Sequence, residues 1–231
     1  MVLAHVLLKL GYNLVAAHCN FHLRDLDSDT DERLVRDWCA MQNICCEIAH
    51  FETVTYAKEN GISIEMAARN LRYDWFETLR EFVGAQVIAV AHHLNDQVET
   101  FFINVTRGTG ISGLKGIANK NGHVVRPLLF ASRNDIEKYA MFHAIPYRYD
   151  KSNADTNIMR NYIRHEIMPR FEQLNPSFLD TMNRNMRWVG NVVRFLEQQF
   201  VQMERELVTV DGKTVLIRFS ENDEASVFQE F

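Results

Sequence analysis

Residues 86 to 100 read QVIAVAHHLNDQVET, and this stretch decides the fold. Its largely apolar run from Gln86 to Ala91 has the length and the β-branched content of a buried strand. From about Asn95 to Thr106 the apolar residues recur at helical spacing, which predicts a helix. A buried strand that passes directly into a helix is the unit from which parallel sheets are built.

The same alternation extends in both directions along the chain. Two more buried strands are expected at residues 13–18 and 44–49. Helices are expected at 1–10, from Ser28 onward with Leu34, Val35 and Trp38 on one face, at 63–83 and at 132–144. Residues 108–116 are expected to form a glycine-rich loop and Arg126-Pro-Leu-Leu129 an extended segment. This order predicts an α/β fold with a parallel, Rossmann-like sheet.

The character of the chain changes near residue 171. Residues 177–206 predict one long helix, and 207–218 predict a hairpin of alternating apolar residues around Asp211-Gly212. We therefore expect a catalytic domain at 1–170. A helical linker and the start of a tRNA- or substrate-binding domain are expected at 171–231.

Composition excludes several classes of protein. With 47% hydrophobic and 24% charged residues the chain is typical of a globular protein. Its formal net charge of -5 gives no overall basic signature for nucleic acid, so a nucleic-acid partner would need a local basic surface. No apolar run reaches the roughly 18 residues of a membrane helix. The four cysteines contain no C-x-x-C pair, and we expect a cytoplasmic protein with reduced thiols.

The densest group of polar side chains follows the strand at 86–91. Asp96 and Glu99 are three residues apart, so on a helix they share one face near its positive end. Two carboxylates there could hold a cationic amine, bind magnesium or act as a base, or they could simply offset the helix dipole. His92 and His93 could bind zinc or could be ordinary surface residues. Spacing leaves these alternatives open.

Two further groups have a functional and a structural interpretation each. His18, His22 and Arg24 follow the strand at 13–18, where open parallel sheets bind ligands, but they could also only tie their own loop. Arg69 and Arg72 are spaced to meet phosphate from one helix face. Glu65 lies four residues before Arg69, which equally predicts an ion pair within the helix.

The last two groups are a glycine-containing turn and a basic stretch. Arg107-Gly108-Thr109-Gly110 could offer backbone amides to a ligand or only end a helix. Residues 157 to 194 hold six arginines and three acids, which suits a phosphate backbone but also a solvated helix face.

Taken in order, six motifs resemble those of the tRNA(Ile)-lysidine synthetase family, over about residues 1 to 175. They are His18-x-Asn20-x-His22-x-Leu-Arg24, Ser63-Ile-Glu65-x-Ala-Ala-Arg69-x-x-Arg72-Tyr73, Ala91-His-His-x-x-Asp96-Gln97-x-Glu99-Thr100, Arg107-Gly-Thr-Gly110, Arg126-Pro-Leu-Leu129, and Asp150-x-Ser-Asn153 with Arg160-Asn161-x-x-Arg164.

This resemblance implies an adenine nucleotide alpha-hydrolase-like domain of the N-type ATP-pyrophosphatase, or PP-loop, superfamily. The implied reaction has two steps. ATP adenylates O2 of the wobble cytidine in an isoleucine tRNA with a CAU anticodon, and pyrophosphate leaves. The side-chain amine of free L-lysine then attacks C2 and expels AMP. The resemblance also implies ATP and Mg2+ as cofactors, no membrane partner, and is compatible with a homodimer.

The implied chemistry assigns expected roles to the residues. Lysine binds as an ammonium ion and must lose a proton, so carboxylates are needed near C2. The candidate catalytic residues are therefore Asp96 and Glu99, with Asp96 also a candidate ligand of ATP-bound Mg2+. Candidate contacts to ATP, lysine or substrate are His18, His22, Arg24, Glu65, Arg69, Arg72, His92, Gln97, Arg107, Gly108, Thr109 and Gly110. Candidate tRNA contacts are Arg160, Asn161 and Arg164.

One family motif does not occur in the sequence. The family opens with a strand and a Ser-Gly-Gly-x-Asp-Ser loop that cradles the ATP phosphates. We expect the chain to lack that strand, that loop and the C-terminal domain. If the printed start is the natural one, we expect neither useful ATP affinity nor lysidine formation. Two rival functions remain: a non-catalytic nucleotide-binding module, and another PP-loop tRNA-modifying enzyme such as a thiolase.

Overall fold

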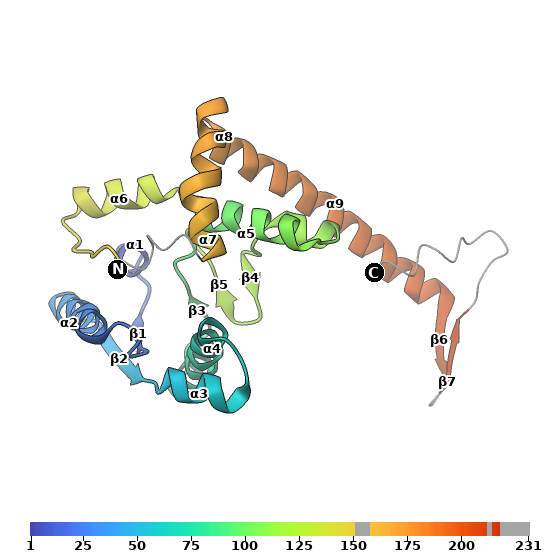
Figure 1. Ribbon diagram of the computed structural model, residues 1–231. Helices are drawn as coiled ribbons and strands as arrows, with labels where there is room; N and C mark the ends of the chain where they lie inside the picture. Colours follow the sequence, from blue (N-terminus) through green and yellow to red (C-terminus); the bar gives the residue numbers. More distant parts are fainter. Residues whose placement is uncertain (151–157, 212–213, 218–231) are drawn as a thin grey trace. The chain divides into compact units, whose positions relative to one another are not determined.

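The computed structural model describes residues 1–150, 158–211 and 214–217 (Figure 1). The chain divides into two compact units, each built from separate stretches of sequence. Unit 1 contains residues 1–94 and 118–153, and unit 2 contains residues 95–117 and 154–231. The predicted domain boundary near residue 170 stays a prediction.

Unit 1 contains two small sheets. Its strands are β1 (Val15–Asn20), β2 (Cys45–His50), β3 (Ile88–Ala89), β4 (Lys120–Asn121) and β5 (Val124–Val125). Strands β1 and β2 pair in parallel, in a register that places Asn20 opposite His50. Strand β5 lies between β3, to which it is parallel, and β4, to which it is antiparallel. The parallel pairs and their crossover helices confirm the predicted α/β class, whereas the antiparallel β4 was not predicted.

The predicted strands differ from the observed ones in length and burial. The strand predicted at 86–91 shrinks to two residues, although its hydrogen bonding to β5 continues to the N–H of Val90, 3.0 Å from the Val125 oxygen. The two other strands begin one or two residues later than predicted. Val15 and Val87 are 40% and 46% exposed, so the prediction of fully buried strands was wrong. Among the described residues each of these strands has a partner on one edge only, and an apolar run does not encode the number of partners.

The helices of unit 1 largely follow the predicted ranges, except for a helix at residues 53–60 that was not predicted. They are α1 (Val2–Lys9), α2 (Asp25–Met41), α3 (Thr53–Asn60), α4 (Ile64–Phe82) and α6 (Arg133–Phe142). At the start of α4 the side chain of Ser63 accepts a hydrogen bond from the N–H of Met66. Ser132 and Asp135 form a capping box at the start of α6. These caps satisfy N–H groups that have no partner inside the helix, which explains why both starts were predictable.

Helix α2 begins three residues earlier than predicted. Its first residue, Asp25, has a φ of 43°, a left-handed value that few residues other than glycine adopt. The predicted start, Ser28, is buried inside the first turn, where its Oγ accepts a hydrogen bond from the N–H of Arg24. A capping pattern read from the sequence does not recognise an entry through a left-handed turn.

The segment predicted to be extended at residues 126–129 is instead a pair of turns. The N–H of Leu129 lies 3.4 Å from the Arg126 oxygen, and that of Ala131 lies 3.0 Å from the Leu128 oxygen. The φ that Pro127 fixes suits the second position of a turn as well as an extended chain, so the proline did not decide between them.

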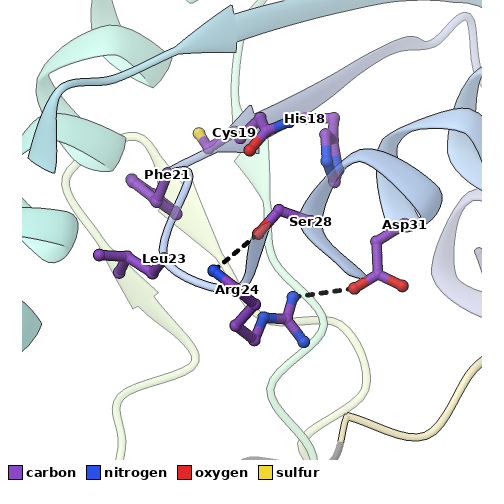
Figure 2. Close-up of a pocket in the computed structure, with 8 residues that line it drawn as sticks. His18, Cys19, Phe21, Leu23, Arg24, Ser28 and Asp31 are labelled. Carbon is purple, nitrogen blue, oxygen red and sulfur yellow. Dashed lines mark hydrogen bonds and ion pairs between the residues drawn. The ribbon is translucent and has the colours of Figure 1, made fainter. Parts of the chain in front are cut away.

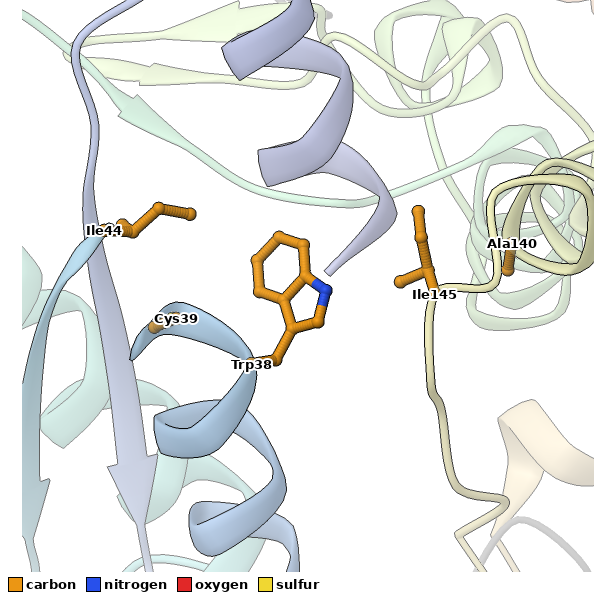
Figure 3. Packing of buried hydrophobic residues seen from close by; sticks show 5 residues of the cluster. All are labelled: Trp38, Cys39, Ile44, Ala140 and Ile145. Carbon is orange, nitrogen blue, oxygen red and sulfur yellow. The ribbon is translucent and has the colours of Figure 1, made fainter. Parts of the chain in front are cut away.

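The core of unit 1 lies between α2, the start of β2 and the segment after α6. The indole of Trp38, which is 4% exposed, lies between Ile44 and Ile145 (Figure 3). Cys39 and Ala140 complete this cluster. One aromatic side chain therefore joins the end of α2 and the residue before β2 to a segment about one hundred residues further along the chain.

Over its described residues, unit 2 is helical, with one hairpin. Its elements are α5 (Leu94–Arg107), the 3-10 helix η1 (Ile111–Lys115), α7 (Met159–Tyr162), the π-type turn η3 (Ile163–Ile167), α8 (Met168–Leu174), α9 (Phe178–Leu207), β6 (Val208–Asp211) and β7 (Thr214–Ile217). The predicted long helix and the antiparallel hairpin are confirmed, although the turn residues 212–213 lie outside the described residues. The predicted loop at 108–116 contains η1, which was not predicted.

Aromatic stacking and one apolar helix face hold unit 2 together. The ring of Phe171 stacks on those of Phe102 and Phe178, with centroids 5.4 and 5.0 Å apart. Along α9, Met182 and Met186 continue the buried face that begins at Phe178, at the spacing expected of one helix side. Within the described part of the chain, no helix is long and apolar enough to cross a membrane.

Removal of the Trp38 side chain tests the core of unit 1. We expect Trp38→Ala to lower the free energy of unfolding by about 3–5 kcal/mol, because it leaves a cavity where three segments meet. Phe142→Ala on α6 is the matched control, since Phe142 is 84% exposed, and we expect it to change stability by no more than about 0.5 kcal/mol. Urea unfolding measures both, and equal losses in the two variants would contradict the assignment of Trp38 to the core.

Candidate functional site

A small cavity lies in unit 1 where β1 ends and α2 begins (Figure 2). Its lining residues are His18, Cys19, Asn20, Phe21, Leu23, Arg24, Ser28 and Asp31. Its volume of about 120 Å³ is well below the roughly 300–1,000 Å³ of typical small-molecule sites. The cavity can therefore hold one group of a ligand, such as a base or a sugar, but not a whole nucleotide.

Asn20 organises the loop that borders this cavity. Asn20 is buried, with 2% of the residue exposed. Its Nδ2 donates to Asp29 Oδ1 and Glu32 Oε2, each at 3.0 Å. Its Oδ1 accepts the N–H of His22 at 3.1 Å, which supports the left-handed φ of 51° at His22. The amide thus has a partner for each polar atom. Asn20 belongs to one of the sequence motifs, but the motif alone did not indicate this role.

A pair of histidines lies at the same end of the β1–β2 sheet. His22 Nε2 and His50 Nδ1 are 3.0 Å apart, and the two rings stack with centroids 5.1 Å apart. His50 Nε2 also lies 3.5 Å from Glu32 Oε2. Sequence reasoning missed His50, although it ends the second parallel strand, at the sheet edge where ligand-binding residues gather.

Arg24 is held by two acids. Its guanidinium lies 2.8 Å from Asp31 and 2.8 Å from Asp150, and Figure 2 shows it directed at the Asp31 carboxylate. Its charge is therefore compensated within the protein, and the interpretation of this loop as tied by its own side chains holds for Arg24. Residues 151–153 of the Asp150 motif lie outside the described residues.

Burial sets the charge state of two residues that line the cavity. Burial lowers the pKa of His18, and the nearby charges of Glu32 and Asp31 oppose this without cancelling it. The His18 ring is therefore neutral at pH 7. Burial also raises the pKa of Cys19 to about 11, with Arg72 acting in the opposite direction. The Cys19 thiol therefore stays protonated and is a weak nucleophile.

Helix α4 contributes one of its three candidate residues to this region. The guanidinium of Arg72 lies 5.1 Å from the ring centroid of Phe21, which lines the cavity. Arg69 instead lies over the ring of Tyr73, at 5.1 Å. Glu65 is exposed, and in the described part of the chain it makes no ion pair with Arg69. The helix-internal ion pair that spacing allowed is not formed.

His92 and His93 are half-buried between β3 and α5. Across residues 1–150, 158–211 and 214–217, no group of three His, Cys, Asp or Glu side chains is placed to hold a metal ion. The zinc alternative for these histidines therefore has no support from geometry.

The strongest cluster of charges lies in unit 2, around Glu99. This side chain has 0% exposed surface, and Arg164 contacts both its oxygens, with Nε 2.7 Å from Oε1 and Nη2 3.0 Å from Oε2. Arg160 Nε lies 3.4 Å from Oε2, and Arg160 Nη2 donates to Thr100 Oγ1 at 3.0 Å. The structure thus joins two motifs that lie some sixty residues apart in sequence.

Asp96 lies in the first turn of α5, beside the same arginine. Its Oδ1 is 3.9 Å from Arg164 Nη2, and its side chain is 15% exposed. Arg164 itself belongs to the π-type turn η3, a distortion that is frequent at functional sites. Desolvation acts to lower the pKa of Arg164, but the hydrogen bonds to Glu99 and the charges of both acids outweigh it, so the pKa is raised.

The remaining candidates of unit 2 lie in structural or exposed positions. Gln97 is 8% exposed and packs against Gly116, where a Cβ would lie 3.3 Å from its Oε1. Asn161 is also buried, at 6% exposure. Arg107 and the three residues after it are exposed, and Gly108, with a φ of 79°, follows the last turn of α5. Helix termination, one of the two sequence alternatives for this turn, is therefore what the backbone shows.

Comparison with known proteins shows close relatives of one kind. The chain is 48% identical over 194 residues to a tRNA(Ile)-lysidine synthase of Porphyromonas gingivalis (strain ATCC 33277), which covers 84% of the chain and 43% of the relative. It is 42% identical to the synthase of Bacteroides thetaiotaomicron over 212 residues, 92% of the chain and 50% of the relative. The chain spans about half the length of the curated relatives it matches.

A solved structure and a family model agree on the fold. A U34-tRNA thiolase from Methanococcus maripaludis superposes with a TM-score of 0.66 at 15% identity, over 82% of this chain and 68% of that one. At this identity the likeness shows the fold alone. The model of the PP-loop domain matches residues 1–171. Since that match covers most of the chain, the chain belongs to the PP-loop domain family, as its motifs predicted.

Proposed function

We propose that this chain is the ATP-dependent catalytic part of an enzyme that joins lysine to C2 of the wobble cytidine in an isoleucine tRNA with a CAU anticodon. The observation that carries the proposal is its identity of 40–48% with tRNA(Ile)-lysidine synthases over 84–95% of its length. The geometry of the PP-loop fold alone suits several tRNA modifications. The residue contacts described above indicate how this chain would contribute to this one.

The two acids of α5 take different roles in this proposal. Glu99 is fully buried against Arg164 and Arg160, so it acts as a positioning residue for these arginines. Asp96 lies at the positive end of the helix and is partly exposed, so it can meet the ammonium group of lysine. The amine nitrogen then bonds to C2 while the bond from C2 to the adenylated oxygen breaks, and AMP leaves with that electron pair. Asp96 accepts the proton that the amine loses.

The cavity of unit 1 is the proposed contact for the nucleotide. A neutral His18 and the ring of Phe21 offer an uncharged surface for a base or sugar, and Arg72 adds a cation beside it. Magnesium is usually held by one or two carboxylates together with substrate phosphates. Asp96 would supply one carboxylate, and the ion would offset phosphate charge. The proposed location of the enzyme is the cytoplasm, where tRNA is modified.

Contacts to tRNA fall to arginines that remain exposed. Arg160 and Arg164 are engaged by Glu99, so they would hold the substrate only through the order they impose on their segment. Arg184, Arg187 and Arg194 of α9 are exposed and belong to the same basic stretch. Free lysine and a homodimer complete the proposed set of partners.

Thiolation is the second function that the fold admits, since a tRNA thiolase shares it. Sulfur transfer needs a reactive thiolate or a cysteine-held cluster. Cys19, the one cysteine that lines the cavity, has a pKa raised to about 11, and Cys46 likewise has a pKa of about 11 because of burial. Their protonated thiols favour the ligase.

Incorporation of labelled lysine into an isoleucine tRNA transcript tests the proposal. Protein that contains these 231 residues, extended upstream by the Ser-Gly-Gly-x-Asp-Ser phosphate loop, is incubated with ATP, magnesium and radioactive lysine, and the transcript is then isolated. We expect lysine to be attached at the wobble cytidine and not at uridine in the same position. Sulfur incorporation, with no lysine attached, would favour the thiolase instead.

Substitution of Asp96 tests its role as the group that receives the proton. We expect Asp96→Asn to lower the rate of lysine attachment by about 10²–10⁴-fold, the usual range for a general base, with little loss of stability. Asp180→Asn is the matched control, because Asp180 is an exposed acid in the first turn of α9. A rate of lysine attachment for Asp96→Asn within twofold of the control would show that Asp96 takes no part in the chemical step.

The Glu99–Arg164 pair is tested by a double-mutant cycle. Glu99→Gln leaves the guanidinium of Arg164 without its main counter-charge, so we expect a loss of about 3–5 kcal/mol in unfolding free energy. The double variant Glu99→Gln/Arg164→Met should lose less than the two single variants together, since it removes both charges. Urea unfolding measures all three, and strictly additive losses would show that the pair is not coupled.

The lowered pKa of His18 predicts a pH dependence of stability. As pH falls through about 6.5, the unfolded chain takes up a proton that the folded ring resists, so this contribution to stability is complete above pH 7 and lost below it. We expect the Tm of the wild type to fall more between pH 8 and pH 5 than that of His18→Gln. His123→Gln, an exposed histidine of unit 1 beside Glu77, is the control. Identical pH profiles for wild type and His18→Gln would refute this.

A further inference from the structure

Arg126 is a buried cation with little to balance it. The residue is 9% exposed, and its Nη1 donates to the carbonyl oxygen of Ala118 at 2.8 Å. Its Nε is buried and has no hydrogen-bond partner among the residues that the structure describes. In the described parts of the chain no carboxylate forms an ion pair with it. A guanidinium has five N–H donors and a permanent charge, so one backbone oxygen leaves most of its binding capacity unused.

Other arginines of unit 1 show what this position lacks. Arg24 and Arg148 each contact two acids although their side chains are 34% exposed. Arg80, with a side chain that is 15% exposed, lies 2.7 Å from Glu77 and 3.2 Å from Glu81. A more buried guanidinium should need more compensation from the protein, because burial removes its hydration. Arg126 has less, which points to a counter-charge from outside the chain.

The place of Arg126 in the fold suits a ligand. It directly follows β5, whose parallel neighbour β3 runs toward His92. Its N–H donates to the oxygen of Asn119, which fixes the backbone at this point. The carboxyl ends of adjacent parallel strands form the edge at which open α/β sheets bind their ligands. The charge that the protein leaves uncompensated is thus at the end of unit 1 where a substrate is expected.

We propose that Arg126 binds a phosphate group of the substrate. Phosphate oxygens accept the paired N–H donors of a guanidinium and supply the charge that burial requires. Two substrates of the proposed function carry phosphate, the nucleotide triphosphate and the tRNA backbone. The inference rests on that proposed function only for the identity of the phosphate, and it gives a binding role to a residue that the sequence analysis placed in a motif without a role.

The test compares variants that separate a binding role from a structural one. Arg126→Met removes the charge at similar length, and Arg126→Lys keeps the charge without the fork of donors. Arg80→Met is the matched control, since Arg80 is a comparably buried arginine of unit 1 with its own acids. For each protein the Tm is recorded, and isothermal titration measures binding of inorganic pyrophosphate, of ATP and of the isoleucine tRNA transcript.

We expect Arg126→Met to bind at least one of these probes tenfold or more weakly, with a Tm equal to or above that of the wild type. Arg126→Lys should fall between the two, and Arg80→Met should show the opposite pattern, a lower Tm with unchanged affinity. Equal weakening for pyrophosphate and ATP identifies the nucleotide phosphate. A loss confined to tRNA, with a salt slope reduced by about one, identifies the RNA backbone.

Two results would overturn the proposal. One is a Tm that falls by several degrees in both Arg126 variants with affinities unchanged, since this is the behaviour of a structural residue. The other is that wild type and variants bind each of the three probes with equal affinity, or that none of these proteins binds any probe. Neither depends on lysine attachment, so failure of the inference is distinguishable from failure of the proposed function.

Discussion

A buried charge is stable only with a counter-charge held in place, and the Glu99 carboxylate imposes this constraint on unit 2. With no exposed surface it relies on the paired contacts of Arg164 and on Arg160. Loss of either partner would leave a desolvated charge, which costs several kcal/mol. The pair therefore fixes the segment from α7 to η3 against α5, and the π-type turn at Arg164 is the local distortion that accompanies this contact. The stacked aromatic rings around Phe171 add apolar contact. Ring stacking alone does not fix the position of one helix along another.

The same constraint orders the end of the β1–β2 sheet in unit 1, by different means. The Asn20 amide satisfies two carboxylates and one backbone N–H, so the loop after β1 can hold a left-handed residue without a glycine. Arg24 closes the loop onto Asp31 and Asp150. Because the charge of Arg24 is balanced by these two acids, Arg24 does not offer an uncompensated cation to an anionic ligand. Among the buried arginines discussed, Arg126 alone has no acid of the described residues as a partner. An uncompensated charge of this kind is where the opposite charge of a substrate is expected to bind.

Much of the fold could be predicted from the sequence because its signals are local. Ser63 and Ser132 marked the starts of their helices, and the apolar residues of α9 recur at helical spacing over its thirty residues. The strands were harder, since an apolar run such as Val87 to Ala91 does not encode how many neighbours the sheet supplies. The motifs contain the residues of both polar clusters, yet which of these residues contact one another could not be read from the motifs. The contacts of Glu99 with Arg164 and of His22 with His50 join distant segments, and the burial of Arg126 depends on packing that no spacing rule contains.

Spacing treats Asp96 and Glu99 as equivalent, and burial separates them. A carboxylate that is fully enclosed by two guanidinium groups cannot also accept a proton from lysine without leaving those charges unbalanced. Asp96, which lies in the first turn of its helix with 15% of its side chain exposed and an arginine 3.9 Å away, is therefore the acid to which we assign the lysine ammonium group in the proposed function. Arg164 thus meets the two acids differently: it contacts both oxygens of Glu99 but lies 3.9 Å from Asp96. In the proposed function a motif of two acids and two arginines therefore supplies one base and its support, and the same requirement for a counter-charge underlies the phosphate site proposed at Arg126.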